Sequence, residues 1–112
     1  MELTVELEKL LRELESKIKA QDVRGIKYAE AERDYKVALS KEAIRMKVEL
    51  EYPVTLIDKV VHGCDAVAEL RFKRDIEKHN YENVVEEINS IKLRIRIVEA
   101  QLKAEYGCAK YQ

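Results

Sequence analysis

The sequence has little glycine, proline and cysteine, and no tryptophan. Its 112 residues include three Gly, one Pro and two Cys. So few residues that interrupt regular structure indicate long helices with few turns. Two cysteines are too few for a disulfide framework, and we expect Cys64 to behave as a small, partly buried side chain beside a turn.

The sequence also lacks an excess of charge of one sign. Lys and Arg number 21 against 22 Asp and Glu, which gives a formal net charge of −1. A protein that grips duplex nucleic acid through its whole surface carries a clear basic excess, so a general nucleic-acid binder is disfavoured. Weak contact through a local basic patch stays open.

Long apolar runs are absent as well. The start, MELTVELEKLLRELE, is acidic and has neither the basic region nor the apolar core of a signal peptide. No apolar stretch approaches the length that spans a bilayer. We therefore expect a cytosolic protein without a membrane contact, with its thiols reduced.

The sequence is rich in charged residues, and these alternate with apolar residues at regular helical spacing. Charged residues make up 38% of the chain and hydrophobic residues 46%. This combination is typical of amphipathic helices with a narrow apolar stripe, whereas a disordered chain lacks the register. At this length we expect one domain, spanning residues 1–112.

The first helix is predicted from about 4 to 48, with Thr4 as its cap. Gly25 interrupts the pattern and marks either a bend or a break. Apolar residues alternate in steps of three and four, which is a coiled-coil stripe: Leu3, Leu7, Leu10, Leu14 and Ile18.

A corner over residues 49–64 is predicted to follow the first helix. Pro53 pushes the residue before it out of the helical region. Thr55 and Asp58 resemble a capping box for a short helix at about 56–62, and Gly63 suits the position just after that helix.

The second long helix is predicted from about 65 to 105, with Asp65 as its N-cap and Gly107 as its stop. The stretch 91–97 alternates like a strand, but the helical spacing continues on both sides of it. The stripe is the longest in the sequence: Val67, Leu70, Arg74, Glu77, Tyr81, Val84, Ile88, Ile91, Ile95, Val98 and Leu102. A second row, with Leu93 and Ile97, predicts packing against more than one helix over the C-terminal half.

These elements predict an all-α fold: a long antiparallel, coiled-coil-like helical hairpin with a short corner helix, assembling into a helical bundle. A lone thin hairpin buries little surface, so we expect a homo-oligomer, a dimer or larger. A monomeric three-helix bundle, broken at Gly25, is the alternative.

We expect self-association along the seam of the hairpin. The pattern assigns to it Tyr35, Leu39, Arg74, Glu77, Tyr81, Val84, Ile88, Ile91 and Ile95. Polar seam residues cost stability unless they are paired, but they fix register. An antiparallel arrangement about Ile57 would place Glu42 opposite 71–74 and Tyr35 near Glu77. A ligand pocket in the polar seam is the alternative reading.

No catalytic, cofactor or metal site is predicted. Neither histidine has Glu at the spacing of a bundle metal site, and the pairs Asp75–His79 and His62–Cys64 are isolated. The carboxylates are interleaved with Lys and Arg, unlike the paired motifs of all-helical nucleotide pyrophosphohydrolases. No phosphate-binding loop or nucleophile–base set is evident, so we expect no enzyme and no cofactor.

A small basic-aromatic surface is predicted for partner contact: Tyr52, Arg71, Phe72 and Lys73. A second basic group comprises Lys92, Arg94 and Arg96. Cations beside aromatic rings hold single strands without sequence preference, so contact with nucleic acid is a weaker alternative to a protein partner.

Three segments, ERDYKVAL at 32–39, YPVTLI at 52–57 and AELRFKRD at 68–75, resemble short helical proteins of Gram-positive phages and prophages. These are encoded near single-strand annealing and single-strand-binding genes. The resemblance covers about 28–102, contains no catalytic motif, and implies a phage origin, a bacterial cytosol and a role near DNA replication or recombination.

The leading hypothesis is a non-enzymatic, self-associating phage accessory protein that binds a protein partner through its helices in replication or recombination. The alternative is an anti-CRISPR-like inhibitor that binds and blocks a host defence protein, in which rows of carboxylates imitate nucleic-acid phosphates.

Overall fold

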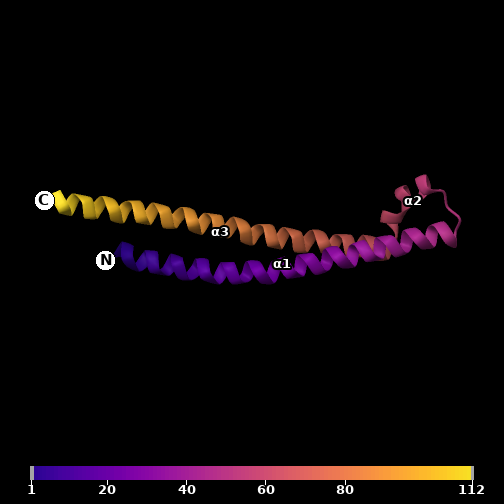
Figure 1. Cartoon of the computed structure of the whole chain (residues 1–112), viewed down its shortest axis with the longest axis horizontal. Helices are drawn as coiled ribbons and strands as arrows, with labels where there is room; N and C mark the ends of the chain where they lie inside the picture. The colour runs from indigo at the N-terminus through magenta and orange to yellow at the C-terminus, as the bar shows by residue number, and fades with distance from the viewer. Residues whose placement is uncertain (1, 112) are drawn as a thin grey trace. The chain divides into compact units, whose positions relative to one another are not determined.

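The protein is an all-α helical hairpin (Figure 1). The computed structural model describes residues 2–111, with the side chains of 2–107. Helix α1 spans Glu2–Val48, α2 spans Val54–Val60, a 3-10 turn covers Val61–Gly63, and α3 spans Asp65–Tyr111. No strand occurs in residues 2–111, so the stretch 91–97 is helical, in line with its flanking periodicity.

Helix α1 is continuous through Gly25. One glycine weakens a helix by about 1 kcal/mol without ending it, and periodic packing on both sides exceeds that cost. The alternative with a break at Gly25 is therefore not what this structure adopts. Thr4 lies inside the first turn, because α1 begins at Glu2, so its prediction as a cap is wrong.

The chain forms two compact units. One unit combines Met1–Val23 with Glu82–Gln112, and the other is Arg24–Tyr81. We call them the terminal unit and the corner unit. Each contains a segment of α1 antiparallel to a segment of α3, as the pairs Lys17–Glu87 and Glu32–Arg74 show. That the chain is one domain remains a prediction.

The corner unit has a core of its own beside the turn. Met46 of α1, Ile57 of α2 and Val61 of the 3-10 turn are buried together. Leu39, Ala43 and Val60 pack around them. The last turns of α1 thus pack against the corner, as Figure 1 shows for α2 lying where α1 ends and α3 begins.

The corner helix begins earlier than predicted and is capped differently. Pro53, with φ −66° and ψ 150°, is the N-cap, and its carbonyl accepts the N–H groups of Leu56 and Ile57 at 2.9 and 3.1 Å. Thr55 is therefore inside α2, and no side chain caps it. The predicted capping box is wrong, because proline sets the extended geometry by itself.

The three remaining predictions of helix ends, Gly63, Asp65 and Gly107, are displaced as well. Gly63 ends the 3-10 turn without a positive φ, whereas Glu51 has φ 55° just after α1. Cys64 is extended and its carbonyl accepts the Ala68 N–H at 2.8 Å, so Cys64 holds the N-cap position and Asp65 follows it. Gly107 does not stop α3, which continues to Tyr111.

In the terminal unit, the buried residues come from the inner faces of the two long helices. They are Leu10 of α1 with Val84, Ile88, Ile91 and Val98 of α3. Lys17 and Glu87 form an ion pair beside this row. The spacing of three and four thus places a continuous apolar stripe against the opposite helix.

Candidate functional site

The nine predicted seam residues all lie on the inner face of the hairpin. In the corner unit, Tyr35 is buried, and Leu39, Arg74, Glu77 and Tyr81 are half-buried. In the terminal unit, the inner row is Val84, Ile88, Ile91 and Ile95, of which the first three are buried. Within each unit, the seam residues therefore face the other long helix of the same chain, and their role in self-association remains a prediction.

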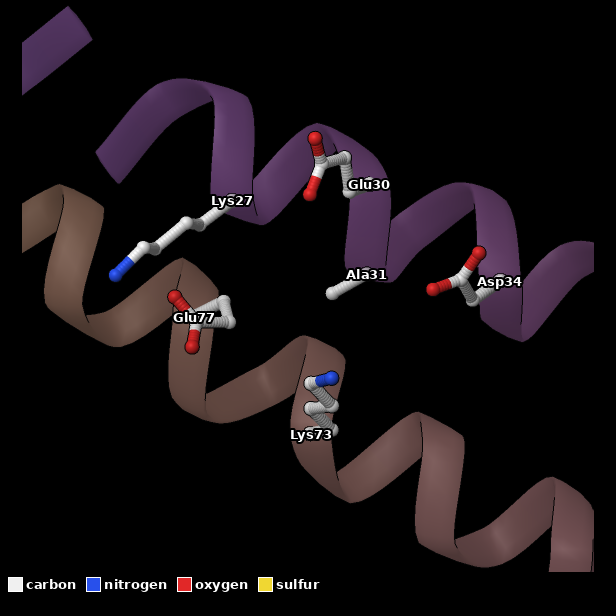
Figure 2. A pocket seen from close by; sticks show the side chains of 6 residues that line it. All are labelled: Lys27, Glu30, Ala31, Asp34, Lys73 and Glu77. Atoms are coloured by element: carbon white, nitrogen blue, oxygen red, sulfur yellow. The ribbon is translucent and has the colours of Figure 1, made fainter. Parts of the chain in front are cut away.

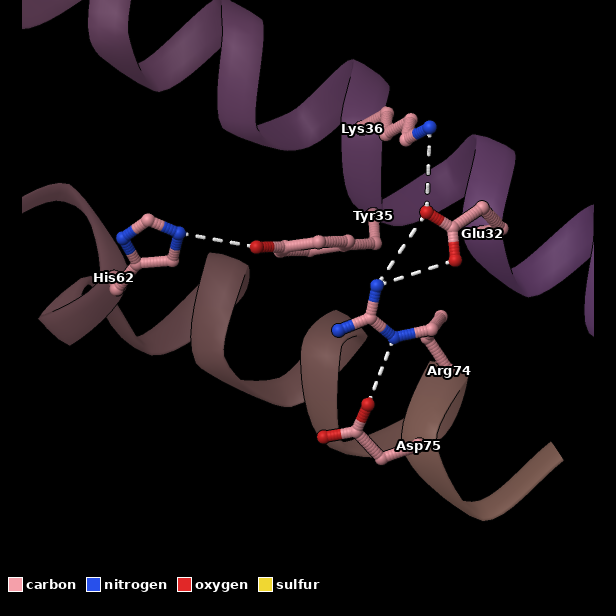
Figure 3. Close-up of polar contacts among 6 residues, drawn as sticks. All are labelled: Glu32, Tyr35, Lys36, His62, Arg74 and Asp75. Atoms are coloured by element: carbon pink, nitrogen blue, oxygen red, sulfur yellow. Dashed lines mark hydrogen bonds and ion pairs between the residues drawn. The ribbon is translucent and has the colours of Figure 1, made fainter. Parts of the chain in front are cut away.

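Arg74 is the most connected charged residue of the seam (Figure 3). Its Nη1 lies 3.1 Å from Glu32 Oε2, and its Nε donates to Asp75 Oδ1 at 2.8 Å. The guanidinium carbon lies 4.7 Å from the centroid of the Tyr35 ring, a cation–π distance. Lys36 joins the group through Glu32, at 3.4 Å.

This ion-pair group shifts the pKa of two members. The hydrogen bond from Arg74 holds the pKa of the Glu32 carboxyl below its ordinary value, against the opposing effect of burial. Burial lowers the pKa of Arg74, but hydrogen bonds to Glu32 and Asp75 raise it overall. Both shifts favour the charged forms, so the pair is a stable ion pair at neutral pH.

Tyr35 links α1 to the corner. Its hydroxyl and His62 Nε2 lie 3.0 Å apart and form a hydrogen bond, with the ring centroids 6.4 Å apart. Figure 3 shows the Tyr35 ring between His62 and Arg74. Sequence reasoning considered His62 only as a partner of Cys64, because periodicity says nothing about side chains in a 3-10 turn.

The predicted register is wrong. Arg74 faces Glu32 instead of Glu42. Glu42 instead accepts a hydrogen bond from Arg45 Nε at 3.0 Å, which lowers the pKa of the Glu42 carboxyl against the opposing effect of burial. The physical reason is that the last turns of α1 pack against α2, so α3 begins opposite an earlier part of α1.

Glu77 does not meet Tyr35 either. It lines a pocket of about 270 Å³ with Lys27, Glu30, Ala31 and Asp34 of α1 and with Lys73 of α3. Figure 2 shows these side chains around the small Ala31. The Oε2 atom of Glu77 is buried and has no hydrogen-bond partner, which carries a desolvation cost. Charges of both signs line the pocket.

The predicted partner surface falls in two places. Tyr52, 37% exposed, lines a corner pocket of about 560 Å³ with Met46, Leu50, Leu56 and Val60 among its neighbours. Arg71, Phe72 and Lys73 are exposed on α3, and Phe72 is 64% exposed. Leu50 and Leu56 were missed, because no helical period runs through the corner.

Two outer rows of apolar side chains remain exposed. On α1, the outer row comprises Ile26, Val37, Ile44 and Val48. On α3, the outer row comprises Leu93, Ile97, Ala100 and Ala104. The second row predicted for α3 is thus exposed, and among residues 2–107 no other helix covers it. The Phe72 and Ile76 side chains are exposed on α3 as well.

Among the side chains of residues 2–107, no group of three or more His, Cys, Asp or Glu is placed to hold a metal ion. The same residues include no helix that is long and apolar enough to cross a membrane. Cys108 lies beyond the side chains that the structure describes.

Comparison of the chain with protein-family models, with curated proteins and with solved structures finds no match.

Proposed function

We propose that this chain is a non-enzymatic accessory protein that self-associates and binds a protein partner through the outer faces of its helices. The observation that carries the proposal is the pair of exposed apolar rows on α1 and α3, beside a seam that is already filled. Exposed apolar side chains that recur along one face of a helix mark candidate interaction sites.

The outer row of α1 is the surface we assign to self-association. Its large side chains, Ile26, Val37 and Ile44, are all exposed within the corner unit. Glu30 and Arg33 lie on the same face between Ile26 and Val37, Lys41 lies beside Val37 and Ile44, and all three charged residues are exposed. An antiparallel pairing of two copies brings Glu30 of each copy opposite Lys41 of the other, so apolar contact and charge agree.

The resemblance to phage and prophage proteins supports a role beside a replication or recombination complex in a bacterial host. The balanced net charge of −1 favours protein contact over nucleic-acid contact in that role.

Light scattering behind size exclusion tests the proposal, at several concentrations and with or without a single-stranded oligonucleotide. We expect a dimer or larger assembly whose mass does not change when the oligonucleotide is added. Val37→Gln with Ile44→Gln should give a monomer, because the substitution removes two apolar side chains from the proposed contact. Leu93→Gln with Ile97→Gln is the matched control and should leave the assembly unchanged.

Two results would contradict the proposal. A wild-type monomer at all concentrations would exclude self-association. A complex with the oligonucleotide that weakens steeply with salt would assign the chain to nucleic-acid binding instead.

A further inference from the structure

The outer row of α3 has the spacing of a coiled-coil seam. Leu93, Ile97, Ala100 and Ala104 follow steps of four, three and four, the same pattern as the inner row of α3. Leu93 is 55% exposed and Ile97 50%, whereas Ile91 and Val98 of the inner row are each 3% exposed. The C-terminal part of α3 therefore has an inner row that packs against α1 and an outer row that is exposed.

Between Leu93 and Ala104, the charges that flank this row have one sign. By helical geometry, Arg94 and Gln101 flank it on one side, and Asn89, Arg96 and Lys103 flank it on the other. All five are exposed, and none of the three cations has an ion pair among the described residues.

The acids near this face lie outside the stretch from Leu93 to Ala104 or toward the inner side of α3. Glu99 lies toward the inner side. Glu86 is exposed on the same face, two turns N-terminal to Leu93, and the adjacent Glu87 is paired with Lys17. Arg94 also lines a pocket with Glu6 and Glu13 of α1, so Arg96 and Lys103 are the cations that point to a partner.

The cations indicate which of two partners binds the row: a second copy of this chain or a different protein. When residues 93–104 pair with the same residues of a second copy, parallel or antiparallel, Arg and Lys of one copy come against Arg and Lys of the other. Like charges across a helix pair are destabilising. The alanines, in contrast, allow a close approach of another helix backbone.

We propose that the outer row of α3 binds an amphipathic helix of a different protein, whose apolar row is flanked by Asp and Glu. This rests on the proposed function of helix-mediated protein binding and names the partner's chemistry. Knobs of the partner's apolar row would pack between Leu93 and Ile97, and its carboxylates would pair with Arg96 and Lys103.

Two synthetic peptides test the proposal with the full chain. Both are four-heptad helices with Leu and Ile along one row; one has Glu at all flanking positions and the other has Lys. Fluorescence anisotropy at low and high salt should show the Glu peptide binding at least about tenfold more tightly than the Lys peptide. This preference should shrink as salt rises.

Variants locate the site. Leu93→Gln with Ile97→Gln should weaken binding of the Glu peptide at least about tenfold, because the apolar contact is lost. Arg96→Glu with Lys103→Glu should reverse the preference between the peptides. Val37→Gln with Ile44→Gln is the matched control on α1 and should bind the Glu peptide like the wild type.

Equal binding of the two peptides, or unchanged binding by Leu93→Gln with Ile97→Gln, would overturn the inference. So would conversion of a wild-type dimer to a monomer by that same variant, since a second copy would then occupy the row. The two proposals can fail separately. If the Glu peptide does not bind but Val37→Gln with Ile44→Gln still abolishes self-association, this inference is wrong and the proposed self-association is unaffected.

Discussion

Arg74 combines three contacts that few other residue types can make at once. Its planar guanidinium pairs with Glu32 and Asp75 and covers the Tyr35 ring. The side chains of Arg74 and Glu32 are 19% and 26% exposed, so the ion pair is screened less than a surface pair. A lysine has the charge but lacks the flat group that stacks on the ring.

Replacing Arg74 should therefore destabilise the fold. We expect Arg74→Met to lower the free energy of unfolding by about 1.5–3 kcal/mol, and Arg74→Lys by less. Urea unfolding followed by circular dichroism measures the change. Arg33→Met, which loses an exposed pair with the adjacent Asp34, is the control and should change stability by less than about 0.5 kcal/mol. An unchanged midpoint for Arg74→Met would show that the contacts do not stabilise the fold.

Acid should weaken the protein through Glu32 and Glu42. Hydrogen bonds from Arg74 and Arg45 hold the pKa of these carboxyls below the ordinary value. A group with a depressed folded-state pKa stabilises the fold above its unfolded pKa, and this stabilisation is lost as pH falls through the folded value. We expect the free energy of unfolding to fall as pH is lowered from about 5 to about 3.

Urea unfolding across that pH range provides the measurement. The dependence on pH should be shallower for Glu32→Gln with Glu42→Gln, because neither side chain titrates. Parallel curves for the wild type and this variant would assign the acid sensitivity to other carboxylates.

The Glu77 side chain should lower the free energy of unfolding. Its Oε2 is buried without a hydrogen-bond partner, although Lys27 and Lys73 line the same pocket. We expect Glu77→Met to raise the free energy of unfolding by about 1 kcal/mol, since it removes an unsatisfied polar atom and keeps the side-chain volume. A loss of stability measured by urea unfolding would mean that the carboxylate is paired in solution.

At the level of the helix, Gly25 lies where α1 passes the Tyr81 ring. A Cβ atom at this position would meet Tyr81 Cε1 at 3.4 Å, which is a close but ordinary contact. Alanine fits this space and removes the conformational cost of glycine in a helix interior, whereas a larger side chain would meet the ring.

We expect Gly25→Ala to raise the free energy of unfolding by about 1 kcal/mol and Gly25→Leu to lower it. Thermal unfolding by circular dichroism checks both, and the Leu variant with Tyr81→Ala should recover part of the loss. A stable Gly25→Leu protein would show that Tyr81 moves aside without cost.

The helices were predictable because their signal is local and repeated. The stripes from Leu3 to Ile18 and from Val67 to Leu102 predict the helices, which are observed. Most stripe residues are buried or half-buried as predicted, but Ile18 is 43% exposed. The register was not predictable, because it depends on how many residues the corner uses. The predicted caps were wrong for a related reason. Pro53 and Cys64 hold the N-cap positions through their extended backbone, which side-chain capping patterns do not reveal.

The candidate surfaces were only partly predictable. The second row on α3 could be found from periodicity, yet the pattern could not say whether another helix of the same chain covers it. Tyr52 was named, but the apolar pocket around it depends on the fold of the corner. The hydrogen bond between Tyr35 and His62 joins elements that no sequence period relates.

At the level of the whole molecule, the two units differ in the chain separation of their contacts. In the corner unit, Met46 packs with Ile57, only a short distance along the chain. In the terminal unit, Lys17 pairs with Glu87 across most of the sequence. Closing a longer loop costs more entropy, so we expect the corner unit to form first and the terminal unit to follow.

Folding kinetics test this order. Met46→Ala should mainly slow folding, whereas Leu10→Ala should mainly speed unfolding, because the terminal unit is absent from the transition state. Both changes remove a buried side chain and should cost about 2–5 kcal/mol, enough for clear shifts in stopped-flow urea experiments. A slower folding rate for Leu10→Ala would reverse the order.

The order of the two segments of the terminal unit along the chain also has a consequence during translation. The segment up to residue 23 is translated before the segment from residue 82 on, against which it packs. Until that later segment is made, the stripe from Leu3 to Ile18 lacks its partner in the terminal unit. A ribosome-associated chaperone would meet this apolar stripe first, so we expect the nascent chain to depend on such protection until the later segment is made.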